Sequence, residues 1–377
     1  MSTTPTSVRE GGPNLKGPLD YPSSPLRHST RQPLMLGVFL DMQDRHISNH
    51  PTSNTWTFPT ISTSRMQWLP KGGYDGEASL DAFVALGAMA AATKSILLIS
   101  TIHILYGPLH PLHIAKFGAT LDHISNGRWG INVVTGHREI EHQMFGWNRI
   151  EHDHRYEMAG ELLDVVNSLW GETENISYEG RVSPWKLENA WVTPKPVFGR
   201  PVLVNATGSP AGIDFAVRYS DLVFITSPGG ADITSALESL PEHVKGIKEK
   251  AKALGREIKV LINPVVVSKD TSEETWAYLQ NIVDGMDEGS GHMKVVKSYD
   301  SDAHAWRGHK TPGKQGYKLG GNIEVIGTPK EVVEQLVALH GVGIDGVMLG
   351  FYDWRADFDH FLEKVLPLLK EAELRVD

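Results

Sequence analysis

The sequence predicts an α/β protein folded as a (β/α)8 barrel, and three observations support this prediction. Short apolar runs alternate with amphipathic helical segments along the chain, and no break in composition separates them. Polar residues follow the ends of two neighbouring runs, and parallel barrels place their ligand sites at that edge. The length of 377 residues exceeds a typical single domain but suits a barrel with insertions. The pattern therefore indicates an enzyme.

The first half of the chain shows three apolar runs typical of buried strands and one shorter strand-like piece, at residues 34–40, 96–102, 129–134 and 66–69. The segments with apolar residues at helical spacing are residues 79–93, 111–125 and 155–170. Ser79 suits the N-cap of the first helix. The turn Asn126-Gly127 separates the second helix from the strand that follows.

The alternation resumes after residues 171–200, a Pro-rich excursion with turn signals and short strands. The later strands are expected at residues 202–206, 222–226, 259–267 and 346–350. The later helices are expected at residues 210–219, 231–254, 272–287, 329–339 and 356–373. Gly255 suits the end of the second of these helices. Residues 288–325 lack periodicity, and a loop of that length predicts a lid or a binding insertion.

One segment departs from the barrel pattern. Between Leu40 and Met66 the chain has prolines, many Ser and Thr residues, and no apolar stripe at helical spacing. Consecutive parallel strands need a crossover connection, which is usually a helix. The first crossover helix is therefore predicted to be missing or irregular.

Composition bounds the remaining possibilities. Residues 1–33 are rich in Ser, Thr, Pro and Gly and predict a disordered tail, which leaves residues 34–377 as one domain. The net charge of -9 argues against a nucleic-acid partner, and no apolar stretch has the ~18 residues of a membrane span. The absence of Cys excludes disulfides and thiolate metal sites, and the 17 His lack metal-ligand spacing, so no metal is expected. We expect a cytoplasmic location.

Polar residues at two strand ends are the candidate catalytic groups. Asn132 lies inside the apolar run WGINVV, and a buried amide must either bond to backbone or face a ligand. Thr101 ends the preceding strand, although Thr is also common in ordinary strands. His137 follows the strand-end pair Thr135-Gly136, where its imidazole could contact substrate or cofactor.

Two helix starts are candidate anion sites. Gly208 and Ser209 join a strand to a helix, where free N–H groups suit a phosphate, but Ser209 could equally be a simple N-cap before Pro210. Arg155 and Tyr156 begin a long helix and could hold a phosphate. The alternative for Arg155 is a surface ion pair within the charged segment EHDHRYE.

Three motifs together resemble the bacterial luciferase-like flavin monooxygenases, in the branch of the pyrimidine, dimethylsulfone and alkanesulfonate monooxygenases. They are INVVTGH (131–137), HDHRYEMAGELLDVVNSLW (152–170) and VLVNATGSPAGIDFAVRYSD (202–221). The resemblance runs from Leu34 to the C-terminus and implies a barrel enzyme that receives reduced FMN from an NAD(P)H-dependent flavin reductase. With O2 it would oxygenate a small polar organic substrate through a flavin (hydro)peroxide. The resemblance also implies a homo-oligomer.

The resemblance also assigns residues. It implies that Thr101 and Asn132 line the oxygen pocket beside the flavin. The positions implied to contact the flavin are Glu141, Arg155 and Tyr156, with Gly208 and Ser209 at the phosphate and Gln67 and Trp68 beside the isoalloxazine. Two alternatives stay open: hydride transfer with a deazaflavin on the same barrel, and a truncated, inactive flavin-binding barrel that lacks its first helix.

Overall fold

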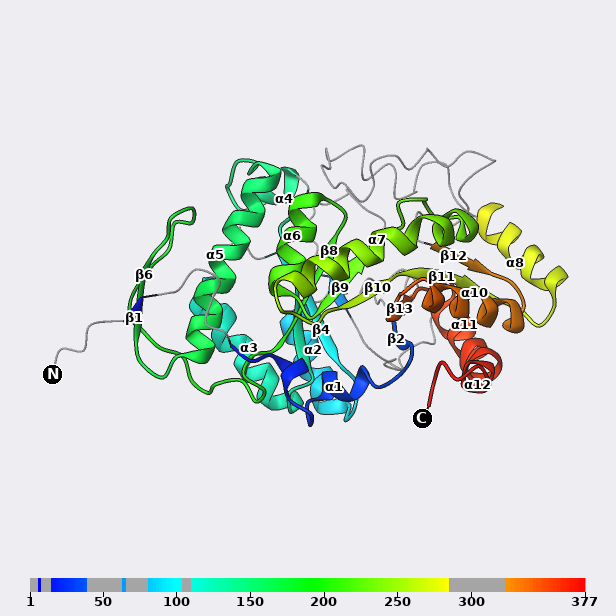
Figure 1. The fold of residues 1–377 in the computed structure, drawn as a ribbon, viewed down its shortest axis with the longest axis horizontal. Coiled ribbons are helices and arrows are strands. Elements are labelled where there is room, and N and C mark those ends of the chain that lie inside the picture. Colours follow the sequence, from blue (N-terminus) through cyan, green and yellow to red (C-terminus); the bar gives the residue numbers. More distant parts are fainter. Residues whose placement is uncertain are drawn as a thin grey trace, which may run out of the picture. The chain divides into compact units, whose positions relative to one another are not determined.

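The computed structural model describes residues 6–7, 15–38, 63–65, 81–103, 110–137, 139–284 and 323–376. The chain divides into two compact units. The first contains residues 1–28, 41–206 and 210–221, and the second contains residues 29–40, 207–209 and 222–377. In each unit parallel strands alternate with helices, so the predicted α/β class is confirmed (Figure 1).

The first unit contains a four-stranded parallel sheet in the order β8-β5-β4-β3. Its strands are β3 (Thr63–Arg65), β4 (Leu98–His103), β5 (Trp129–Val134) and β8 (Val202–Thr207). The register sets Thr101 opposite Asn132, and Asn132 opposite Val204. The side chains of Thr101, Asn132 and Val204 thus form one row across three neighbouring strands.

The helices of the first unit are α2 (Ala82–Ala92), α3 (Pro111–Ser125), α4 (Glu139–Met144), α5 (His152–Gly171) and α6 (Pro210–Tyr219). Buried residues of α2, α3, α5 and α6 share a hydrophobic core with Leu98, Trp129, Ile131, Val133 and Leu203 of the sheet. Side chains alternate between the two faces of a strand. The row of Thr101, Asn132 and Val204 therefore lies on the face away from that helical core.

A buried arginine connects the elements around this core. Arg128 donates from Nε to Ser125 O, from Nη1 to Thr93 Oγ1 and Ile96 O, and from Nη2 to Ala90 O and Thr93 O. The acceptors include the last carbonyls of α2, whose partial negative charge favours a cation. Burial lowers the pKa of Arg128. The guanidinium thereby holds the end of α2 against the turn that leads into β5.

Residues 15–33 contain helices, although composition predicts a disordered tail there. Within residues 15–33 lie the 3-10 helix η1 (Pro18–Asp20) and α1 (Pro25–Ser29). A Cβ at Gly17 would lie 2.5 Å from the Arg200 guanidinium, so any larger residue would have to displace that side chain. Arg200 in turn makes a bidentate ion pair with buried Asp221, at 2.6 and 2.7 Å. Long-range packing, which composition does not reveal, orders this segment.

The excursion at 171–200 contains short strands, as predicted. β6 (Ile176–Glu179) and β7 (Lys186–Ala190) form an antiparallel pair, and β1 (Thr6–Ser7) adds to β6 in parallel. They form a separate three-stranded sheet in the order β1-β6-β7. The hairpin loop between β6 and β7 is fixed to α5, which matters for a cavity described below.

The second unit has a parallel sheet in the order β2-β13-β10-β9. These strands are β2 (Met35–Val38), β9 (Leu222–Ile225), β10 (Lys259–Ile262) and β13 (Gly346–Leu349). β11 (Pro264–Val267) and β12 (Ile323–Ile326) form a second parallel pair. The helical segments are α7 (Ile233–Ala253), α8 (Ser272–Asp284), α10 (Pro329–Gly341), α11 (Trp354–His360), the π-helical turn η3 (Phe361–Val365) and α12 (Leu366–Glu371).

Three expectations differ from the structure in the second unit. The strand predicted at 259–267 is two strands separated at Asn263, and β12 begins at Ile323, inside the stretch predicted as loop. The single helix predicted at 356–373 changes to a π-helical turn before Pro367, which has no N–H to continue the helical ladder.

Three further expectations fall outside the described residues: the missing helix after Leu40, the strand at 66–69, and the lid at 288–325, of which only residues 323–325 are described. The described strand nearest to the first two is β3, at 63–65. Within the described ranges, no helix combines the length and apolar character needed to cross a membrane.

Candidate active site

Two of the predicted catalytic residues meet across neighbouring strands. Asn132 of β5 donates from Nδ2 to Thr101 Oγ1 of β4 at 3.2 Å, and both side chains are buried. Among the described residues, no hydrogen-bond partner is present for Asn132 Oδ1. A buried carbonyl without a partner costs free energy, and a donor on a bound molecule would remove that cost. The pair can therefore offer a ligand one acceptor, and the Thr101 hydroxyl can donate.

A second buried amide on this sheet escapes the sequence analysis. Asn205 of β8 donates from Nδ2 to Val133 O at 2.8 Å, one position beyond the last register pair of β5 with β8. By strand alternation it lies on the helical face, opposite to Asn132. The only signal in the sequence is a polar residue inside the run VLVNAT. Asn205 ties the two strands together where their ladder ends.

Arg155 is buried, which excludes the surface ion pair that its charged neighbours had left open. Its Nη1 donates to Ile150 O at 2.9 Å, in the loop before α5. Glu151 caps this helix by accepting from His154 N at 2.8 Å. This hydrogen bond fixes the buried guanidinium beside the start of α5, and a fixed cationic fork of this kind suits an anion.

The other predicted residues are placed as follows. Tyr156 is half-buried, and its ring contacts those of His152 and Phe215 at centroid distances of 5.4 and 5.7 Å. Glu141 is buried in α4, and half-buried His137 follows Gly136, whose φ of 79° favours glycine.

The turn before α6 has the predicted form. Buried Ser209 comes directly before Pro210, the first residue of the helix, and Gly208 is exposed. The N-terminus of a ten-residue helix favours an anion. Gln67 and Trp68 lie outside the described residues. In the part of the chain that the structure describes, no group of three or more acidic or His side chains could hold a metal ion.

The family model for luciferase-like monooxygenases matches residues 63–346. The chain belongs to this family. The match confirms the family and the luciferase-like barrel class that the three sequence motifs predict. The monooxygenase class of activity is confirmed with it.

Two curated relatives and one solved structure illustrate the similarity. The FMNH2-dependent dimethylsulfone monooxygenase of Pseudomonas fluorescens (strain Pf0-1) is 31% identical over 80% of this chain and 81% of its own length. The pyrimidine monooxygenase RutA of Allorhizobium ampelinum is 29% identical over 79% and 82%. The crystal structure of DmoA from Hyphomicrobium sulfonivorans has a TM-score of 0.71 at 21% identity, covering 84% of this chain and 79% of that one. The last similarity concerns the fold alone.

Proposed function

We propose that this protein is a two-component monooxygenase that uses reduced FMN and O2 to oxygenate a small polar organic molecule. The observation that carries the proposal is the buried pair of Thr101 and Asn132 in a member of this family. Reduced FMN would come from a separate NAD(P)H-dependent flavin reductase, in the cytoplasm. The relative from Pseudomonas fluorescens is named for its dependence on FMNH2, which favours FMN over the deazaflavin alternative.

Two parts of the described structure suit a flavin phosphate. Buried Arg155 and the N-terminus of α6 at Gly208 and Ser209 are each suited to an anion. We assign the phosphate to the α6 turn and a flavin contact to Arg155. Following the family resemblance, we assign Tyr156, Glu141, Gln67 and Trp68 to the same cofactor.

The chain's own residues would prepare the reaction rather than perform its redox step. Bound reduced FMN supplies the electrons that activate O2. Thr101 and Asn132 would hold oxygen in place by hydrogen bonds on a face from which burial excludes water. His137, three residues after the end of β5, is assigned to a contact with the substrate or with the flavin.

The first test is binding of FMN, oxidised and reduced, by fluorescence titration with thermal unfolding alongside. A ligand that binds the native state raises apparent stability, so reduced FMN should raise the Tm. A folded protein that binds a deazaflavin instead would favour hydride transfer, and failure to bind either would favour the inactive barrel. Given binding, a screen with a flavin reductase would start with dimethylsulfone and pyrimidines, after the names of the two relatives.

We also propose that two copies of the chain pair through α2 and α3. α2, with the sequence AFVALGAMAAA, has no polar side chain, yet Val84 is 76% exposed. On α3, Phe117 and Ile124 are 44% and 53% exposed, and the rings of Phe117 and Phe83 lie 5.9 Å apart. A helix apolar on all sides is normally covered. A second α2–α3 face offers both the small residues and the large apolar ones needed to cover it.

A further inference from the structure

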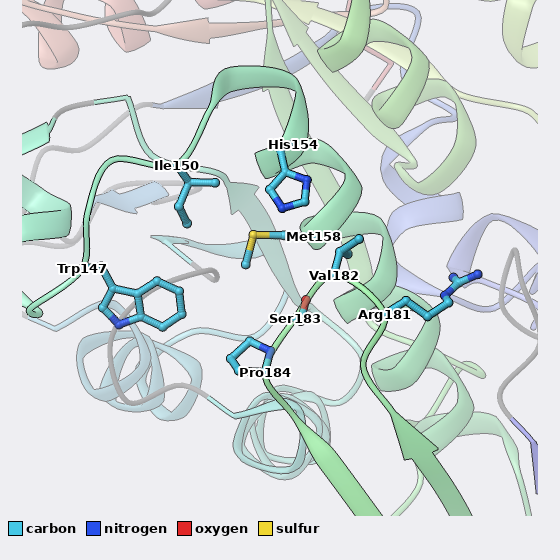
Figure 2. Close-up of a pocket in the computed structure, with 8 residues that line it drawn as sticks. All are labelled: Trp147, Ile150, His154, Met158, Arg181, Val182, Ser183 and Pro184. Atoms are coloured by element: carbon cyan, nitrogen blue, oxygen red, sulfur yellow. The ribbon is translucent and has the colours of Figure 1, made fainter.

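A cavity of about 630 Å³, open to solvent on one side, lies in the first unit beside the start of α5 (Figure 2). Its lining is mostly apolar and includes Trp147, Ile150, Met158, Val182 and Pro184. This volume and lining are typical of sites for small molecules. None of the residues that we assign to flavin or oxygen lines it. The proposed function therefore leaves the cavity without a role.

One wall of the cavity is fixed by a buried carboxylate. Glu161 of α5 accepts from Tyr178 Oη at 2.5 Å, from Arg181 N at 2.6 Å and from Val182 N at 3.3 Å. Burial acts to raise the pKa of Glu161, but these hydrogen bonds outweigh it and hold the pKa below its usual value. The ionised group therefore pins the loop between β6 and β7 against α5.

The opposite wall is also held in place. Ile150 O accepts from Arg155 Nη1, and Glu151 caps α5 one residue later. Because hydrogen bonds fix both walls, the cavity exists before any ligand arrives. Such pre-formed sites avoid the entropy of ordering loops on binding.

One polar group faces the cavity with a defined hydrogen-bond role. His154 lies beside Met158, whose side chain points from α5 toward Trp147 and Pro184, whereas the Arg181 guanidinium points away (Figure 2). His154 Nδ1 lies 2.8 Å from Glu157 Oε2, and a carboxylate accepts a proton, so Nδ1 carries the hydrogen. In the neutral ring Nε2 is then an acceptor.

We propose that this cavity binds a small aromatic molecule that carries a hydrogen-bond donor, of the class of phenols. The ring would lie between Trp147, Met158 and Pro184, since indole and thioether groups interact favourably with aromatic rings. The hydroxyl would donate to His154 Nε2. No residue that we assign to the flavin lines this site, and the site is tested without flavin.

The test uses the full chain with its methionine methyl groups labelled with carbon-13 and observed by NMR. The resonance of Met158, one of 10 methionines, is assigned with Met158→Leu. Titration with p-cresol should shift it saturably, whereas exposed Met144 of α4 serves as an internal control. Toluene should bind more weakly, by about tenfold, because it lacks the hydroxyl.

Two variants separate the parts of the proposal. His154→Phe should weaken the binding of p-cresol about tenfold, because it removes the hydrogen-bond acceptor. The affinity for toluene, which has no hydroxyl, should change by less than about twofold. Trp147→Ala should weaken both probes. The proposal is overturned if p-cresol leaves Met158 unshifted at millimolar concentration, or if Met144 shifts in parallel without saturation. Equal affinity of native protein for p-cresol and toluene would overturn the donor requirement.

Discussion

Asn132 Nδ2 donates to Thr101 Oγ1 across two neighbouring parallel strands, at 3.2 Å. The bond exists because the register pairs these two residues, so their side chains leave the sheet on the same face. The bond uses an amide hydrogen of Asn132. The buried carbonyl oxygen of the same side chain has no hydrogen-bond partner among the described residues. Together the two residues form a small polar spot on the face of the sheet away from the helical core.

Replacing Asn132 with Ala should uncouple oxygen use from product formation and leave FMN binding largely intact. The change removes the acceptor proposed to hold oxygen but no group proposed to hold the phosphate. The measurement is product formed per O2 consumed, with a substrate from the screen above, together with the Kd for reduced FMN. Asn205→Ala is the matched control, since it removes a buried amide from the other face of the sheet. Unchanged coupling in Asn132→Ala would exclude the oxygen role.

Arg155→Lys should weaken the binding of reduced FMN by about tenfold or more, because Lys keeps the charge but loses the fixed fork of N–H donors. The Kd from fluorescence titration tests this. Thermal unfolding without FMN serves as the control for folding, since Arg155 also bonds to Ile150 O. An affinity equal to that of native protein would remove Arg155 from the flavin site.

Arg128→Met should lower the free energy of unfolding by about 3 kcal/mol, because it leaves several buried carbonyls without a donor. Chemical denaturation measures the loss. Arg355→Met, at an exposed position on α11, is the matched control and should change stability by less than about 0.5 kcal/mol. Similar losses in the two variants would contradict the structural role of Arg128.

Buried Asp122 should make stability depend on pH. Burial raises the pKa of Asp122 to about 6, against an opposing hydrogen bond from Val197 N. The folded state therefore binds the proton more tightly than the unfolded state, and stability falls as pH rises from about 4 to about 6.

Asp122→Asn removes this titration. Between pH 4.5 and pH 7.5, the native protein should lose about 2 kcal/mol more free energy of unfolding than the variant loses. Chemical denaturation at the two pH values measures the difference, and Asp359→Asn, at an exposed position, is the control. A difference of the same size in the control would show that Asp122 is not its source.

Val84→Asp should separate the proposed dimer, because it places a charge in the apolar face of α2. Light scattering with size-exclusion chromatography gives the mass in solution. Val337→Asp, on a half-exposed position of α10, is the control and should leave the mass unchanged. A native protein that is monomeric at high concentration would contradict the dimer directly.

The sequence predicts the regular elements well where periodicity and turn chemistry agree. The helices at 111–125 and 210–219 and the strand at 129–134 match the structure to the residue. Asn126, which ends the first of these helices, has a φ of 55° and is a residue type that tolerates the left-handed region. Local signals of this kind are visible in a single sequence.

The parts that the sequence does not reveal depend on contacts between distant residues. The strand-end position of Thr101 and Asn132 is predictable, but their hydrogen bond requires a register that one sequence does not contain. Asn205 resembles any polar residue in a strand until its bond to Val133 O is known. Residues 15–29 pack near Arg200, which lies 183 positions after Gly17, and composition does not reveal a contact over that separation.

The position of Gly17 against the Arg200 guanidinium has a practical consequence for expression of the protein. A gene shortened to begin at the first barrel strand would remove η1 and α1 and expose the buried pair of Arg200 and Asp221 to solvent. Affinity tags and cleavage sites are therefore best placed before Lys16. Residues 15–33, which composition predicts to be part of a disordered tail, should therefore be kept.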